Sequence, residues 1–147
     1  MKIGFTLLEL IVVIIIIGVL ATLGFTQYGR MVERARGAEA KAILGDIRKL
    51  AAAHYLQFGS LQDATNPMTN ERLNLGAGDD EIPTACRGSH YFSYAAQAND
   101  ATTVEITATR CGGAGKAPGG GNSEGDTIVL TSNLSNGTDT WSGTGPW

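Results

Sequence analysis

One apolar run near the N-terminus, IGFTLLELIVVIIIIGVLATLGF (residues 3–25), constrains this chain more than any other feature. The run carries a single acid, Glu9, and the next charge along the chain is Arg30. Because about 20 apolar residues cross a bilayer, the 24 residues from Phe5 to Tyr28 predict a membrane helix. A carboxylate at the centre of such a helix costs about 2.5–3.5 kcal/mol. Glu9 therefore needs a reason to be there.

A secretory signal peptide is the alternative interpretation of this run. Such a signal needs a basic start, an apolar stretch of about 7–15 residues and a small-residue cleavage site. Lys2 supplies a basic start, but no A-x-A site follows, since GFTQYGRMVERARG continues directly into a helical pattern. The sequence therefore predicts that the apolar segment is retained as a helix.

The overall composition indicates one soluble domain after one anchoring segment. The chain has 147 residues, a formal net charge of -3 and a pI of about 5.3. Without a basic patch or a nucleic-acid-reading motif, a specific nucleic-acid site is not expected. The apolar residues are concentrated in the first 28 positions, whereas residues 112–147 are rich in Gly, Ser, Thr and Asn.

The helical pattern continues beyond the apolar run without a break. Apolar residues recur in steps of three and four at Val32, Ala35, Ala40, Ile43, Ile47, Leu50, Ala51, His54 and Phe58. Charged residues fall on the opposite side, among them Glu33, Arg36, Lys41 and Lys49. We therefore expect one helix with an apolar half (5–28) and an amphipathic half (29–58), about 80 Å long and ending at Gly59.

Two glycines interrupt the apolar half, Gly18 and Gly24. Each costs roughly 1 kcal/mol relative to Ala inside a helix. In an apolar segment, small residues allow another helix to pack closely, and glycine also permits local melting or bending. Both interpretations remain open.

The second half of the chain predicts a small sheet. A connector (59–89) is followed by strand-like runs at 90–98, 102–110 and 126–134, with a short fourth at 138–143. Asn99-Asp100 favours a tight turn between the first two strands. The expected fold is α+β, with the amphipathic half of the helix packed on an antiparallel sheet of three or four strands (90–147) and a glycine-rich surface loop (112–125).

Two cysteines, Cys86 and Cys111, are the whole cysteine complement. Their spacing is not C-x-x-C, so zinc binding and thioredoxin-like chemistry are not expected. A disulfide in an oxidising compartment, worth roughly 3 kcal/mol, is the favoured interpretation. Two buried free thiols are the alternative.

The sequence predicts no enzyme, cofactor or metal site. His54 falls on the apolar helix stripe, where a packed histidine is more common than a catalyst. The stretch GGAGKA, which ends at Lys116 and Ala117, resembles a phosphate-binding loop only superficially. Ala117 stands where that motif has the Ser or Thr whose hydroxyl binds the metal ion. Asn122, Glu124 and Asp126 could supply calcium ligands, but a solvated loop is favoured.

A positively charged partner from another subunit would make Glu9 useful. If the chain were cut before Phe5, a new α-amine with a pKa of about 7.7–8 would appear four residues away from it. Glu9 of one subunit could then neutralise the Phe5 amine of its neighbour in a dry interface. The alternative is that Glu9 lies at the membrane edge and extends its carboxylate into water.

The residues Gly4-Phe5-Thr6-Leu7-Leu8-Glu9-Leu10, followed by the apolar run, resemble the class III signal of type IV pilins and pseudopilins. The resemblance implies cleavage of a leader (1–4) after Gly4 by a prepilin peptidase, N-methylation of Phe5 and a subunit-docking role for Glu9. The ending WSGTGPW also resembles pilin C-termini. Thr26 stands where many members have proline, and the cysteine pair lies further from the C-terminus than in many pilins.

The function expected from this resemblance is a pilin, the subunit of a homopolymeric filament on the cell surface. It would wait in the inner (cytoplasmic) membrane and be assembled by the pilus machinery, with adhesion, motility or DNA uptake as outcomes. A pseudopilin of a type II secretion system is the first alternative. A single-pass membrane-anchored binding domain is an alternative from another class.

Overall fold

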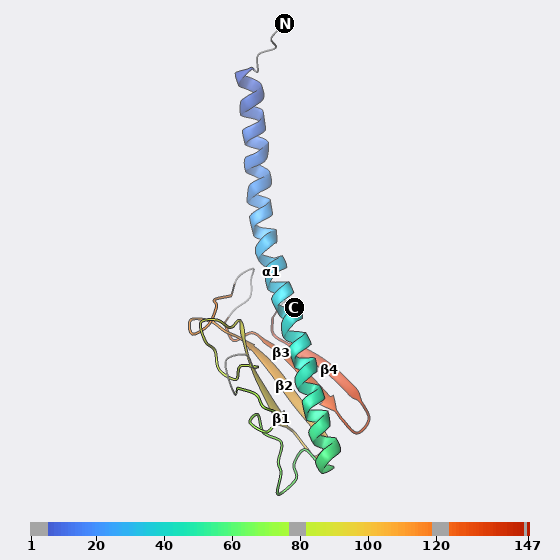
Figure 1. Cartoon of the computed structure of the whole chain (residues 1–147). Coiled ribbons are helices and arrows are strands. Elements are labelled where there is room, and N and C mark those ends of the chain that lie inside the picture. The colour runs from blue at the N-terminus through green and yellow to red at the C-terminus, as the bar shows by residue number, and fades with distance from the viewer. Residues whose placement is uncertain (1–5, 77–81, 119–123, 146) are drawn as a thin grey trace.

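The computed structural model describes residues 6–76, 82–118, 124–145 and 147. These residues form one helix, α1 (Leu7–Phe58), and four strands, β1 (Phe92–Ala98), β2 (Thr103–Arg110), β3 (Thr127–Asn133) and β4 (Thr138–Gly143). In Figure 1 the N-terminal half of α1 projects alone, while its C-terminal half lies on the sheet. The predicted α+β fold is confirmed, and we call the sheet, the connector and the C-terminal half of α1 the head.

Both ends of α1 are capped, the first by a side chain and the last by a glycine backbone. Thr6 is the N-cap, and Gly59 ends the helix in the left-handed region with φ of 74°. The Gly59 N–H donates to the Tyr55 carbonyl at 2.8 Å, which satisfies one of the last free carbonyls of the helix. Between these caps α1 runs for 52 residues and continues through Gly18 and Gly24. The expected first residue, Phe5, lies outside the described residues.

The four strands follow one another in the sheet as an antiparallel meander, in the order β1-β2-β3-β4. The β1–β2 connection is held by Asp100, whose carboxylate accepts hydrogen bonds from the N–H groups of Thr102 at 2.7 Å and Thr103 at 2.8 Å. A turn was predicted here because Asn and Asp bond to their own backbone. Buried and partly exposed residues alternate along β2 and β3, so each strand turns one face toward α1.

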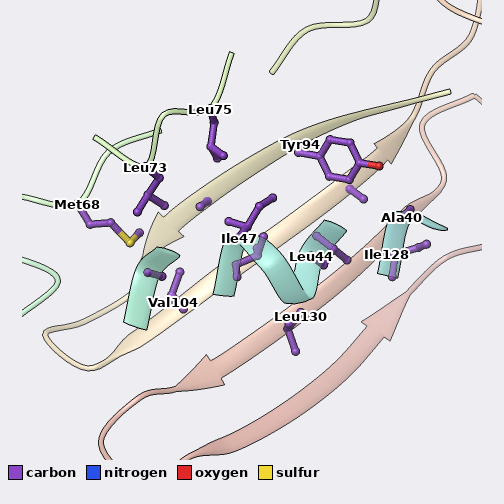
Figure 2. Close-up of a cluster of buried hydrophobic side chains, with 14 of the residues drawn as sticks. Ala40, Leu44, Ile47, Met68, Leu73, Leu75, Tyr94, Val104, Ile128 and Leu130 are labelled. Atoms are coloured by element: carbon purple, nitrogen blue, oxygen red, sulfur yellow. The ribbon is translucent and has the colours of Figure 1, made fainter. Parts of the chain in front are cut away.

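The core lies between α1 and this face of the sheet (Figure 2). Its helix residues, all with no exposed surface, are Ala40, Leu44, Ile47 and Ala51. The sheet contributes Val104, Ile106, Ala108, Ile128 and Leu130, and the connector contributes Leu61, Met68, Leu73 and Leu75. Each fully buried Leu, Ile or Val stabilises the fold by about 1.5–3 kcal/mol. This cluster is what fixes the helix to the head.

The buried stripe of α1 differs in part from the predicted one. Ala35 and Leu50, which the periodicity placed in the core, are exposed, and Leu44 is completely buried. Glu33 was expected on the solvent side, yet only 2% of it is exposed. The observed stripe starts at Glu33, where an arginine of the sheet meets its carboxylate.

The connector protects one edge of the sheet. The Tyr94 N–H donates to the Pro83 carbonyl and the Ala96 N–H donates to the Asn70 side chain, each at 2.8 Å. Residues 70–75 of the connector form hydrogen-bonded turns. At the other edge, every residue of β4 is exposed.

Candidate functional site

The projecting half of α1 carries an apolar surface that nothing in the described chain covers. Every large apolar side chain from Leu7 to Phe25 is exposed, and even the most covered of them, Ile11 and Val12, are 45% exposed. This segment is long and apolar enough to cross a membrane. Exposed apolar area of this extent marks a surface that a lipid or another apolar helix must cover.

Glu9 lies at the start of this surface and caps the helix. Its Oε2 accepts hydrogen bonds from the Thr6 N–H and the Thr6 hydroxyl, both at 2.9 Å, and its own N–H donates to Thr6 Oγ1 at 3.3 Å. This reciprocal arrangement is a capping box, in which the acid sits at the positive end of the helix dipole. Glu9 is exposed, so its carboxylate is also open to a partner from outside the chain.

Gly18 and Gly24 present open notches on the same surface. A Cβ added at either would meet no heavy atom within 4 Å in the described chain. Gly24 lies in a shallow apolar depression with Ala21, Phe25 and Tyr28. Close packing and local melting at these two glycines stay predictions, because both concern the assembled state.

A buried ion pair joins α1 to the sheet at the point where the helix leaves the head. Arg110 Nε donates to Glu33 Oε2 at 3.1 Å and Arg110 Nη2 donates to Glu33 Oε1 at 3.2 Å. Arg36, one turn later, also contacts the Glu33 carboxylate. The bidentate geometry suits a guanidinium and a carboxylate that share one plane. Two groups 77 residues apart in sequence therefore anchor the helix.

The rest of the Arg110 guanidinium holds the loop after β2. Nη1 donates to the carbonyls of Tyr91, Cys111 and Lys116, at 2.8, 3.0 and 2.7 Å respectively, and Nη2 donates to that of Ala117 at 3.2 Å. Cys111 is in turn bonded to Cys86, which ties this loop to the connector. The cysteines thus form the disulfide that the sequence favoured.

Residues 2–25 match the family model of the prokaryotic N-terminal methylation motif. This segment is the class III signal of type IV pilins and pseudopilins. The match includes the capping box and the exposed apolar surface, which are the two features that the geometry singles out.

The class III signal carries direct consequences for the chain. It supports a type IV pilin-like protein or a pseudopilin, which are structural proteins. It implies processing by a prepilin peptidase and assembly into a pilus-like filament, with membrane anchoring beforehand. The expected cleavage and methylation positions, Gly4 and Phe5, lie outside the described residues.

The remaining residues that were considered from the sequence for catalysis or metal binding are His54 and three residues of the glycine-rich loop region. His54 is buried on the helix stripe and packs on Phe58 with ring centroids 4.7 Å apart. Among the described residues, no group of three or more His, Cys, Asp or Glu side chains could hold a metal ion. Asn122, one of the three oxygen-bearing loop residues, lies outside the described residues.

Two features of this site were missed from the sequence. The capping box had a usable signal, since Thr6-Leu-Leu-Glu9 matches the S/T-x-x-E pattern before an apolar run. The Glu33–Arg110 pair had none, because helix periodicity assigns charges to the solvent side and cannot show a partner on a distant strand.

Proposed function

We propose that this chain is the structural subunit of an extracellular type IV pilus-like filament. The observation that carries the proposal is the exposed apolar half of α1 within a class III signal. Packing these helices against one another would bury that surface at about 25 cal/mol per Å² of apolar area. Gly18 and Gly24 allow neighbouring backbones to approach closely in such a bundle.

Glu9 sets the register between subunits in this proposal. The leader (1–4) is cut after Gly4, and Phe5 becomes the methylated N-terminus with a cationic amine. Glu9 of one subunit docks on the Phe5 amine of its neighbour. Before assembly its carboxylate accepts hydrogen bonds from Thr6. On assembly these would be exchanged for an ion pair with the amine of the neighbour.

The head forms the outside of the filament. The sheet, the connector and the glycine-rich loop would face solvent, and the partners of the chain are other copies of itself, the prepilin peptidase and the pilus assembly machinery. The subunit waits in the inner membrane and then becomes part of a surface filament. Adhesion and motility are functions of such filaments.

A pseudopilin of a type II secretion system is the second candidate, since the class III signal is common to both groups. The Cys86–Cys111 disulfide fits either candidate, because the cell exterior and the periplasm are both oxidising, so the location of the processed chain must separate them.

The intact mass of protein sheared from native cells tests the proposal. A chain that starts at N-methylated Phe5 and lacks two hydrogens for the disulfide, found in the sheared fraction, is the expected result. The same processed mass confined to the envelope would favour the pseudopilin. An intact Met1 terminus would contradict both and leave a single-pass membrane-anchored binding domain.

Glu9→Gln tests the docking role separately. We expect the variant to be cleaved and folded but to yield few filaments, because the amine of the neighbour loses its charged partner. Asp46→Asn, which neutralises an exposed acid of α1 within the head, is the matched control and should assemble normally. Normal filament yield from Glu9→Gln would refute the docking role.

A further inference from the structure

Four basic side chains lie on α1 or on the loop beside it where the helix leaves the head, and we call them the basic collar: Arg30, Arg34, Arg36 and Lys116. Arg30, Arg34 and Lys116 are exposed. At about 100° per residue, Arg30 and Arg34 lie about 60° and 100° to one side of Glu33, while Arg36 lies about 60° to the other side. The helix therefore presents positive charge on both flanks of its contact with the head.

Lys116 joins the collar through an aromatic ring. The Arg36 guanidinium lies 4.0 Å from the centre of the Tyr91 ring, and Lys116 Nζ lies 4.5 Å from the same centre. Arg36 Nη2 also donates to the Tyr91 hydroxyl at 3.3 Å. The loop after β2 thus brings Lys116 to the same aromatic ring that Arg36 contacts.

Few acids stand among the collar arginines in the sequence. Glu33 is the only acid between Glu9 and Glu39 in the sequence, and its carboxylate is shared by Arg110 and Arg36. Glu39, one turn beyond Arg36, and Glu124 and Asp126, which follow the glycine-rich loop, are the nearest other acids along these elements. No acid stands between Glu9 and Glu33 in the sequence, so the part of the collar next to the apolar segment, at Arg30, is positive in a chain whose formal net charge is -3.

The position of the collar matches a membrane surface. The apolar stretch from Leu7 to Phe25 is about 28 Å long, close to the roughly 30 Å of a bilayer's hydrocarbon core. It ends at two exposed aromatic residues, Phe25 and Tyr28, the residue type that favours the membrane–water interface. Arg30 and Arg34 follow about 3 and 9 Å beyond Tyr28, which is the depth of the phosphate groups.

We propose that the basic collar binds the phosphate groups of anionic phospholipids while the subunit waits in the membrane. This inference rests on the membrane stage of the proposed function. One guanidinium group can donate two parallel hydrogen bonds to two oxygens of the same phosphate. Lys116 adds a further positive charge on the side of the loop. The bound lipids hold the head at a fixed depth, and a subunit that enters a filament must release them.

The full-length chain in lipid nanodiscs provides the test. Discs contain phosphatidylglycerol and phosphatidylcholine at one to three, and native mass spectrometry of the released protein identifies the lipids that stay bound. The collar variant is Arg30→Gln with Arg34→Gln and Lys116→Gln. The matched control is Lys41→Gln with Lys49→Gln and Arg72→Gln, which removes the same charge from other parts of the head.

We expect the ratio of bound phosphatidylglycerol to bound phosphatidylcholine to be at least about tenfold above the ratio in the disc for the wild-type chain and the control, and less than about twofold above it for the collar variant. Equal enrichment in the collar variant would overturn the proposal, and so would equal loss in the control. The outcome is independent of filament assembly. Filament formation without lipid enrichment would refute this inference and leave the proposed function intact. An unprocessed chain with collar-dependent enrichment would refute the pilin function and leave this inference intact.

Discussion

Arg110 shows how one residue can couple three parts of this molecule. Its guanidinium is enclosed at the end of β2, with 1% of the residue exposed, between the helix acid Glu33 and four backbone carbonyls. A buried charge is tolerated only when its donors are all satisfied, and here they are. Removing one partner leaves an uncompensated charge, which costs more than the pair itself contributes.

Glu33→Gln should therefore lower the free energy of unfolding by about 3–5 kcal/mol, because Arg110 stays buried and positively charged. Urea denaturation of the full chain in detergent, followed by circular dichroism, measures the change. Glu39→Gln neutralises an exposed acid of the same helix and should change stability by no more than about 0.5 kcal/mol. Equal effects of the two variants would show that the buried pair is not special.

Two glycines of α1 should respond in opposite directions to alanine. Gly45 has nothing within 4 Å of an added Cβ, so Gly45→Ala should stabilise the head by about 1 kcal/mol. At Gly37 the Cβ would come within 2.5 Å of the Trp147 ring, so Gly37→Ala must displace it and should destabilise by about 1 kcal/mol. Chemical denaturation gives both values, and tryptophan emission should shift to longer wavelength only in Gly37→Ala. A stabilised Gly37→Ala with unchanged emission would contradict the contact.

At the scale of elements, β4 depends on polar contacts for its place against α1. Arg48 Nε donates to Asp139 Oδ1 at 2.7 Å and to Ser132 Oγ at 2.9 Å, and the Ser132 hydroxyl donates to Asp139 at 2.6 Å. Desolvation alone would raise the pKa of Asp139. The hydrogen bonds from Ser132 and Arg48, with the Arg48 charge, outweigh it and hold the pKa below its usual value.

This lowered pKa gives a pH dependence with a definite sign. The stabilisation is complete above the unfolded pKa of about 3.9 and is lost as the pH falls through the lower folded pKa, because protonated Asp139 no longer pairs with Arg48. Asp139→Asn should be less stable than wild type at neutral pH, and the difference should shrink toward pH 2. Denaturant titrations at several pH values measure it. A difference that stays constant with pH would contradict the assignment.

The helix and the strands could be predicted from the sequence because the local spacing of apolar residues determines them. Features that depend on contacts between distant residues were predicted less well. The long helix follows from uninterrupted 3.6-residue periodicity, and the strands follow from alternation such as Val104, Ile106 and Ala108. The rotation of the helix was misjudged at Ala35 and Leu50, because the buried Glu33 shifts the stripe. The anchoring leucines of the connector were not foreseen, since turns carry no period.

The whole molecule divides into an apolar rod and a head whose core does not use the rod. All core residues, from Ala40 onward, belong to the head, and residues 7–25 of the rod expose their apolar side chains. A chain of residues 29–147 should therefore fold as a soluble monomer with the Cys86–Cys111 disulfide. Circular dichroism, size-exclusion chromatography and a thiol assay test this. An unfolded or aggregated product would show that the rod contributes to the core.

The unbroken passage of α1 from rod to head also has a mechanical consequence. A pull on the rod enters the head at Glu33, the first completely enclosed residue of the helix, and is shared along the buried stripe as far as His54. The load acts in shear over several turns rather than peeling one contact after another. At the end of the stripe nearest the rod, the load passes from Glu33 to Arg110. The next residue, Cys111, is covalently bonded to Cys86. The head is thus fastened most firmly at the end where tension arrives.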